Sequence, residues 1–176
     1  MGVVFHRLLQ TIKLERDAFV WMDFNDRATG DGAILVAITQ VLLALGTGVS
    51  IGHMLRNPLD IVAILLSGGV FWLLYSGATY AIVHYLLNGH GAFPMYLRIS
   101  GFAYPTLLVL IFARLLFDYD QFALILVVGA AWFVVIVARG ISYVSDLATS
   151  RALVAAVGGY VAVVIVQQIA SNLRIF

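Results

Sequence analysis

The sequence predicts an all-α, polytopic membrane protein with five transmembrane helices and an amphipathic, interfacial helix at its N-terminus. Three observations lead to this fold class. Of the 176 residues, 62% are apolar and 11% are charged, whereas soluble domains have about 45–50% apolar and about 25% charged residues. The mean hydropathy is +1.02. Long stretches without Asp, Glu, Lys or Arg recur along the chain, with the length that a membrane-spanning helix needs.

The composition also excludes several classes of protein. The low charge excludes a soluble domain and a disordered chain. The chain has no cysteine, which excludes a disulfide scaffold, thiol catalysis and thiolate metal sites. A net charge of +1 and a pI of about 8.1 give no sign of nucleic-acid binding.

Five segments are long and apolar enough to cross the hydrocarbon core, which takes about 20 residues of helix. The predicted spans are residues 33–52, 59–87, 99–117, 122–138 and 152–170. The second ends where the asparagine and glycines of residues 88–91 break the helix. The third holds Arg114 near its far end, where a long side chain reaches the headgroups. A membrane domain over residues 33–170 therefore lies between an N-terminal segment, residues 1–32, and a short tail, residues 171–176.

The basic residues outside the spans predict the orientation, because cytoplasmic loops are enriched in Lys and Arg. One side of the membrane would carry Arg7, Lys13, Arg16, Arg27, Arg98, Arg139 and Arg151. The other side would carry Arg56, Arg114 and Arg174. This asymmetry places the N-terminus in the cytoplasm and, with an odd number of spans, the C-terminus outside.

Residues 3–22 are expected to form one amphipathic helix on the membrane surface. One face of it would consist of Phe5, Leu8, Leu9 and Ile12. Phe19 and Trp21 are interfacial aromatics in this interpretation. The helix is either an anchor that seats the protein, which we favour, or a docking surface for a partner or lipid. Asp31 or Thr29 is expected to cap the first span.

The connection after the second span contains Gly89 and Gly91, which permit backbone angles that other residues resist. Residues 92–98 are then expected to form a short interfacial segment that includes Phe93. Pro105 lacks an amide hydrogen and predicts a kink within residues 101–105. The kinked helix either borders a cavity or a hinge, or is a packing device, and we favour packing.

The connection before the fifth span carries Asp146 between Arg139 and Arg151. If this connection is helical, residues 139 and 146 share a face. We expect an ion-pair latch between the fourth and fifth spans. A binding site for an anionic ligand is the alternative.

The predicted spans hold almost no ionisable residues, although such residues normally mark transport and proton pathways. Small residues are abundant instead, four apart, as in Gly48 and Gly52, Gly77 and Ala81, Ala155 and Gly159, and Gly158 and Ala162. This spacing lets helix backbones approach closely, within the chain or between subunits. No catalytic, cofactor-binding or metal-binding constellation is present, so we expect no enzyme and no cofactor.

Several motifs resemble the Yip family (Ypt-interacting proteins), in particular its compact prokaryotic branch. Gly89-His90-Gly91-Ala92-Phe93 is similar to the family's glycine-rich aromatic element, and Arg98, Gly101 and Pro105 follow it in the family's order. Residues 26–30 and 146–152 also resemble family positions. The resemblance implies a helical membrane domain with a cytoplasmic N-terminus.

Eukaryotic members of that family work in vesicle traffic and engage prenylated small GTPases. The resemblance does not extend to that function, because the longer polar N-terminal region of those members is not found here. For the prokaryotic branch the resemblance implies a fold and no established chemistry.

Two hypotheses for function follow. The first is a non-enzymatic scaffold or accessory subunit of a prokaryotic inner membrane, in contact with membrane lipids and with other integral membrane subunits or further copies of itself. The second is a transporter or permease-like protein for a small or lipidic solute, with a cavity beside residues 101–105.

Overall fold

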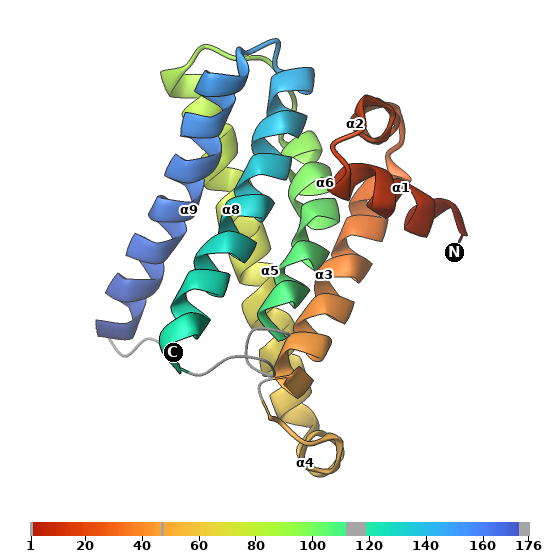
Figure 1. Cartoon of the computed structure of the whole chain (residues 1–176), viewed down its shortest axis with the longest axis vertical. Helices are drawn as coiled ribbons and strands as arrows, with labels where there is room; N and C mark the ends of the chain where they lie inside the picture. Colours follow the sequence, from red (N-terminus) through yellow and green to blue (C-terminus); the bar gives the residue numbers. More distant parts are fainter. Residues whose placement is uncertain (1, 47, 112–118, 173–176) are drawn as a thin grey trace.

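The computed structural model describes residues 2–46, 48–111 and 119–172, and within them all regular secondary structure is helical. The long helices run side by side (Figure 1). They are α3 (Arg27–Gly46), α5 (Pro58–Ala81), α6 (Phe93–Ala103), α8 (Tyr119–Val144) and α9 (Thr149–Asn172). The short helices are α1 (Gly2–Ile12), α2 (Arg16–Phe24) and α4 (Ile51–Arg56). A π-helical turn, η1 (Ile82–Leu86), extends α5, and a 3-10 segment, η2 (Tyr104–Leu108), extends α6.

Helices α5 and α6 lie at the centre of the bundle. Each of them contacts α3, while α9 packs on α5 and α8 packs on both α6 and α9. Helices α1 and α2 lie at the same end of the bundle as the two connections at residues 87–92 and 145–148 (Figure 1). We call this the N-helix end, and the opposite one the α4 end.

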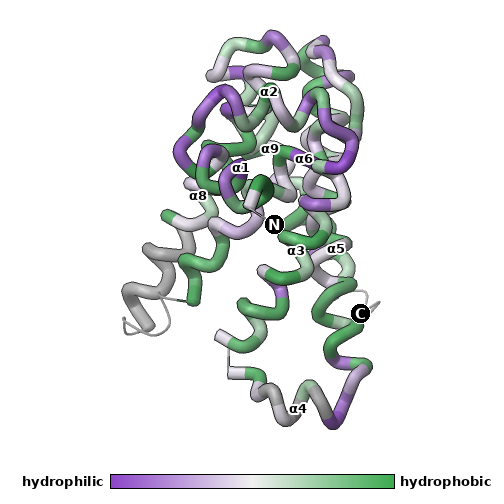
Figure 2. Tube along the Cα trace, turned by 90° about the vertical axis from the view of Figure 1, so that its right-hand side faces the viewer, coloured by the Kyte–Doolittle hydropathy of each residue, from purple (hydrophilic) through white to green (hydrophobic). Residues whose placement is uncertain are grey.

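The apolar helices identify the protein as a multi-pass membrane protein. Four helical segments within the described residues are long and apolar enough to cross a bilayer, namely Arg27–Gly46, Pro58–Leu86, Phe93–Ile111 and Thr149–Ala170. Val128–Val144 of α8 is a shorter apolar helix. Large apolar side chains such as Val154, Val161 and Ile165 stand exposed on α9, as lipid-facing side chains do. Hydrophilic segments concentrate around α1 and α2, the long helices beyond them are mostly hydrophobic, and a second hydrophilic stretch lies beside α4 (Figure 2).

The first long helix begins and ends earlier than residues 33–52. Helix α3 starts at Arg27, whose backbone N–H donates to the side-chain oxygen of Asn25 at 3.1 Å. Asp31 and Thr29 lie inside α3, so the expected cap at either residue is wrong. After Gly46 the chain turns through Gly48, which has φ +98°, a conformation that glycine adopts without strain.

The N-terminal amphipathic segment is two helices rather than one. Leu14 has φ +61° and ends the helical path between α1 and α2. The break lets α2 turn its own apolar face inward, where Ala18, Phe19 and Met22 are completely buried. Phe19 is therefore a core residue and not an interfacial aromatic. No glycine or proline marks this break, so the sequence pattern did not reveal it.

The third long helix begins at Phe93, so residues 93–98 form its first turns and not a separate short segment before it. Every residue from Met95 to Ala103 is buried in the bundle. The α-helical hydrogen bonding ends at Ala103, and η2 carries the chain past Pro105 as a 3-10 helix. A kink is predicted within residues 101–105, and the structure shows a change from α-helix to 3-10 helix there, where the proline ring removes a hydrogen-bond donor.

The last two helices extend beyond the predicted spans, to residues 119–144 and 149–172. Arg114 and residues 173–176 lie outside the described residues.

Candidate functional site

Arg98 joins the N-terminal helices to the membrane bundle. It belongs to α6 and is only 6% exposed. Its NH1 group donates to the backbone carbonyl oxygens of Met22, at 2.8 Å, and Asp23, at 3.3 Å. Its Nε donates to the Thr29 hydroxyl at 2.9 Å, and NH2 donates to the Asp26 carboxylate at 2.6 Å. All three guanidinium nitrogens therefore bind the stretch of chain that runs from the last turn of α2 to the first turn of α3.

The main role of Arg98 is to cap α2. The last carbonyl groups of a helix have no partner inside it, and they attract a cation. Met22 and Asp23 lie in the last turn of α2, which ends at Phe24. The Asp26 side chain is fully exposed, at 100%, so water screens its ion pair with Arg98. The buried bond to the Met22 carbonyl and the partly buried bond to the Asp23 carbonyl therefore outweigh the ion pair.

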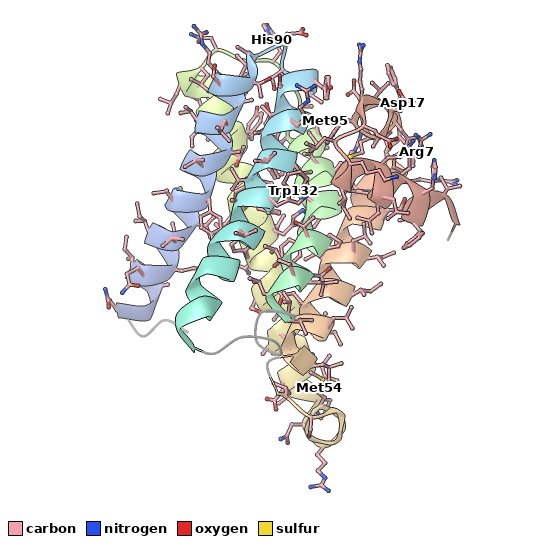
Figure 3. The ribbon with its side chains drawn as sticks, viewed as in Figure 1. Arg7, Asp17, Met54, His90, Met95 and Trp132 are labelled. Carbon is pink, nitrogen blue, oxygen red and sulfur yellow. The ribbon has the colours of Figure 1, made fainter. Side chains whose placement is uncertain are left out.

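Helices α1 and α2 form a small layer that we call the N-terminal platform, residues 2–24. Met95 lies between α6 and α2 (Figure 3), and its sulfur is 3.7 Å from Arg98 NH1. On α1, Arg7 lies beside Asp17 (Figure 3) and donates to its backbone carbonyl at 3.4 Å. The Arg7 guanidinium also lies 5.5 Å from the centre of the Trp21 ring.

A glycine in α8 makes room for the platform. A Cβ atom on Gly140 would lie 2.6 Å from Ile99 Cγ2 and 3.0 Å from Phe19 Cδ1. The ring of Phe19 is also 5.7 Å from that of Tyr143. The platform is therefore packed into the bundle through α6 and α8 as well as tied to it through Arg98.

The two connections at the N-helix end are tied to α6 by Tyr96. Its hydroxyl lies 3.0 Å from the Ser145 hydroxyl and donates to the His90 carbonyl at 3.3 Å. Gly91 has φ +121°, in which a side chain would be strained, and a Cβ there would meet the Tyr96 hydroxyl at 3.4 Å. At Gly89 a Cβ would lie 2.5 Å from Val83. Both glycines are thus needed for the chain to fold back closely onto α6.

The expected latch between Arg139 and Asp146 is wrong. Helix α8 ends at Val144, and Asp146 sits in the connection with φ +53°. No ion pair joins Asp146 to Arg139 or Arg151 in the described part of the chain. The Arg139 guanidinium instead lies over the Tyr143 ring, 4.7 Å from its centre. The connection is closed by the Ser142 hydroxyl, which donates to the Leu147 carbonyl at 2.8 Å.

Polar side chains pair across the helices in the interior of the bundle. The indole N–H of Trp72 donates to the Leu97 carbonyl at 3.0 Å. The hydroxyls of Ser76 and Ser100 lie 2.7 Å apart. These bonds join α5 to α6 where no water is available to satisfy polar groups.

A cavity of about 280 Å³ lies between the long helices, beside η2. Its polar lining consists of Gln40, Ser67, Tyr104, Tyr160 and Gln167. Its apolar lining consists of Leu43, Phe71, Leu107, Leu110 and Ala130. The Gln40 side-chain amide donates to the Tyr104 hydroxyl at 2.6 Å, which joins α3 to η2 at the cavity wall. The cavity thus combines hydrogen-bonding groups with an apolar wall at membrane depth.

The small residues predicted for helix packing divide into two groups. Ala155 is completely buried, and a Cβ on Gly158 would lie 2.8 Å from Ile82 Cδ1. A Cβ on Gly159 would overlap the Thr79 side chain of α5. Gly158 and Gly159 therefore lie at the contact of α9 with α5 and its extension η1, and Ala155 is buried within the bundle.

For the other three, the described residues show no close helix contact at Gly52 or Gly77, and Gly48 lies outside the helices. Gly48 lies in the turn between α3 and α4. A Cβ on Gly52 would meet only Ser50, at 4.0 Å, and one on Gly77 would meet no atom within 4 Å.

Sequence reasoning missed the residues that pair inside the bundle. Gln40 and Tyr104 are far apart in sequence and meet only in the fold, so no local motif links them. The one available signal was a polar side chain inside an apolar span. Within the described residues, no three His, Asp or Glu side chains gather closely enough to hold a metal ion.

Comparison with known proteins identifies a matching family. The family described as Yip1 domain matches residues 16–171, which is nearly the whole chain. No curated protein and no solved structure matches the chain. The matched region begins with α2 and includes Arg98, the glycine connection and every helix that lines the cavity.

Proposed function

The chain belongs to the Yip1-domain family of multi-pass membrane proteins, and we propose that it is a scaffold or accessory subunit of a prokaryotic inner membrane. Members of this family are generally not enzymes. In this proposal the chain binds membrane lipids and other integral membrane proteins, or further copies of itself, through helix contacts.

The observation that carries the proposal is the fixed N-terminal platform. The hydrogen bonds of Arg98 and the burial of Phe19 hold it in one position against α6 and α8. Val3 and Phe5 of α1 are exposed on it. A rigid surface with apolar side chains beside the membrane suits the docking of another membrane protein better than a mobile tail does, because less conformational entropy is lost on binding.

The outer faces of the bundle suit helix contacts with a partner. Gly69 and Gly77 lie on α5, and a Cβ on either would meet no atom within 4 Å. Small residues on an open face allow a second helix to approach closely. Exposed apolar side chains of α9, such as Val157 and Val164, extend the surface that lipid or a partner helix would cover.

The proposed topology has five crossings, with the N-terminus in the cytoplasm and the C-terminus outside. Helix α8 is 26 residues long, enough to cross a bilayer at 1.5 Å per residue. Arg98, Arg139 and Arg151 would then lie toward the cytoplasmic side, with the basic residues of the platform.

The test is native isolation of the membrane protein in mild detergent, with mass spectrometry of everything that travels with it. We expect a second integral membrane protein or a homo-oligomer. The Arg98→Met variant, in which the platform is released, should no longer co-purify with this companion or oligomer. The Arg151→Met variant, which changes an exposed arginine of α9 at the same end, should still co-purify with it. Isolation of the wild type as a monomer with no companion would overturn the proposal.

A second candidate function is transport of a small or lipidic solute, and the cavity beside η2 favours it. A scarcity of charged groups in the membrane interior disfavours ionic solutes. Vesicles that contain the reconstituted protein and a fluorescent lipid test this hypothesis. Faster exchange of the lipid between leaflets than in protein-free vesicles would support transport, and exchange at the same rate would contradict it.

A further inference from the structure

The cavity beside η2 is built by four of the long helices, α3, α5, α8 and α9, together with η2. Gln40 comes from α3, Phe71 from α5, Ala130 from α8 and Gln167 from α9, while Tyr104 starts η2. The polar lining residues all belong to helical segments that are long and apolar enough to cross a bilayer, in which lipid chains rather than water surround a protein.

The 3-10 segment explains why one face of η2 lines the cavity. A 3-10 helix has three residues per turn, so side chains three apart lie one above another. Tyr104 and Leu107 are three apart, and both line the cavity. Leu110, three residues further, lines it as well. The break at Pro105 thus aligns one hydrogen-bonding group with two apolar side chains.

A glycine of α5 sets the position of Gln40. A Cβ on Gly68 would overlap the Gln40 side chain, which therefore lies directly on the α5 backbone. In this position the amide reaches the Tyr104 hydroxyl. That hydroxyl accepts the amide proton, so its own proton is left to donate to a ligand oxygen.

The remaining polar groups of the cavity can also bind a ligand. The Ser67 hydroxyl donates to the Ile64 carbonyl at 2.8 Å, which leaves its lone pairs as acceptors. Tyr160 carries a hydroxyl, and Gln167 an amide with both donor and acceptor atoms. Donors and acceptors are therefore both present around one space.

Among the residues that the structure describes, the lining contains no Asp, Glu, Lys, Arg or His. An ionised headgroup would lose its hydration there without gaining a counter-charge, which is strongly unfavourable. An uncharged headgroup with hydroxyl and ester oxygens would find both donors and acceptors. The apolar lining residues suit the first methylene groups of its chains.

The size of the cavity fits such a headgroup. An apolar cavity of about 150 Å³ holds a molecule of benzene. A cavity of about 280 Å³ therefore has room for roughly a dozen non-hydrogen atoms, which is a glycerol with its ester groups, by the same comparison. The acyl chains must lie outside it, along the lipid-facing helices.

We propose that the Gln40–Tyr104 cavity is an intramembrane binding site for an uncharged glycerolipid, of which diacylglycerol is the simplest. The Tyr104 hydroxyl donates to a lipid oxygen, and the Gln40 amide holds Tyr104 in place. The site needs neither a protein partner nor movement of the lipid across the membrane, so it can hold or fail independently of both functions considered above.

The test uses the full-length protein in phospholipid nanodiscs with a photoreactive diacylglycerol whose diazirine lies next to the ester carbonyl. Mass spectrometry should find the label on the cavity residues, mainly Phe71, Leu107 and Leu110. Unlabelled diacylglycerol should compete, and phosphatidylglycerol, which carries a charge, should not. Competition by both lipids to the same extent would overturn the choice of an uncharged ligand.

Variants separate the site from lipid that merely surrounds the protein. Leu107→Trp fills the cavity and should abolish labelling there. Tyr104→Phe removes one hydrogen bond and should lower labelling about five-fold. Tyr143→Phe, a change from tyrosine to phenylalanine outside the cavity, should leave it unchanged.

A control for folding keeps these results interpretable. Gly68→Ala displaces Gln40 without changing any polar group, and it should lower labelling while the thermal midpoint shows that the protein still folds. Equal labelling of the wild type and of Leu107→Trp, or label spread along the outer face of α9, would show bulk lipid only and overturn the proposal.

Discussion

Gly32 of α3 and Gly101 of α6 meet backbone to backbone. A Cβ atom on Gly101 would lie 2.8 Å from the Cα of Gly32, whereas one on Gly32 would lie 3.5 Å from the Cα of Gly101. The crossing brings the start of α3 against α6, close to the place where Arg98 binds the α2–α3 segment. The close approach of the two helices and the fixed platform are therefore parts of one arrangement.

The asymmetry of this contact predicts unequal effects of two similar substitutions. Gly101→Ala places a methyl group against backbone that cannot rotate away, and should destabilise the fold by about 1–3 kcal/mol. Gly32→Ala makes an ordinary van der Waals contact and gains helix propensity, so its effect should lie within about 1 kcal/mol of zero. Reversible unfolding of both variants in detergent measures the difference, and equal destabilisation would contradict the geometry.

Removal of Arg98 should release the platform without unfolding the bundle. Arg98→Met leaves the carbonyls of Met22 and Asp23 without their donor, which should weaken the docking of α2 by roughly 2–4 kcal/mol. We expect faster protease cleavage between α1 and α3. Asp26→Asn is the matched variant: water screens the ion pair of this fully exposed carboxylate, so cleavage should stay near the wild-type rate.

The contact of α9 with α5 should be sensitive to one methyl group. Gly159→Ala places the alanine methyl group against the β-branched Thr79 side chain, whose rotamers are restricted. We expect a loss of about 1–3 kcal/mol, seen as a lower thermal midpoint in detergent. Gly77→Ala, on the open face of α5, should not lower the midpoint, and a drop similar to that of Gly159→Ala would argue against this packing.

The sequence predicted the membrane class and the approximate helices because both depend on composition and on local breaks. Residues 88–91 and Pro105 ended or altered helices where glycine and proline chemistry indicated. The break at Leu14 escaped prediction because it depends on the burial of Phe19 against Gly140, which tertiary packing alone provides.

The candidate site was predictable only in part. Arg98 stood out as a residue of a recognisable motif, yet its partners on α2 are backbone carbonyls, which no side-chain pattern reveals. The Gln40–Tyr104 pair joins distant parts of the chain in the same way. The Arg139–Asp146 latch failed because α8 ends before Asp146 and the helical spacing behind the prediction no longer applies.

The most direct test of the five-span architecture is the labelling of single cysteines in intact cells with a thiol reagent that cannot cross the membrane. The chain has no cysteine of its own, so each variant reports one position. We expect Arg56→Cys, at the end of α4, to be labelled, and Asp17→Cys and Asp146→Cys, at the N-helix end, to react only after the cells are permeabilised. Labelling of Asp17→Cys and Arg56→Cys to the same extent in intact cells would contradict the account.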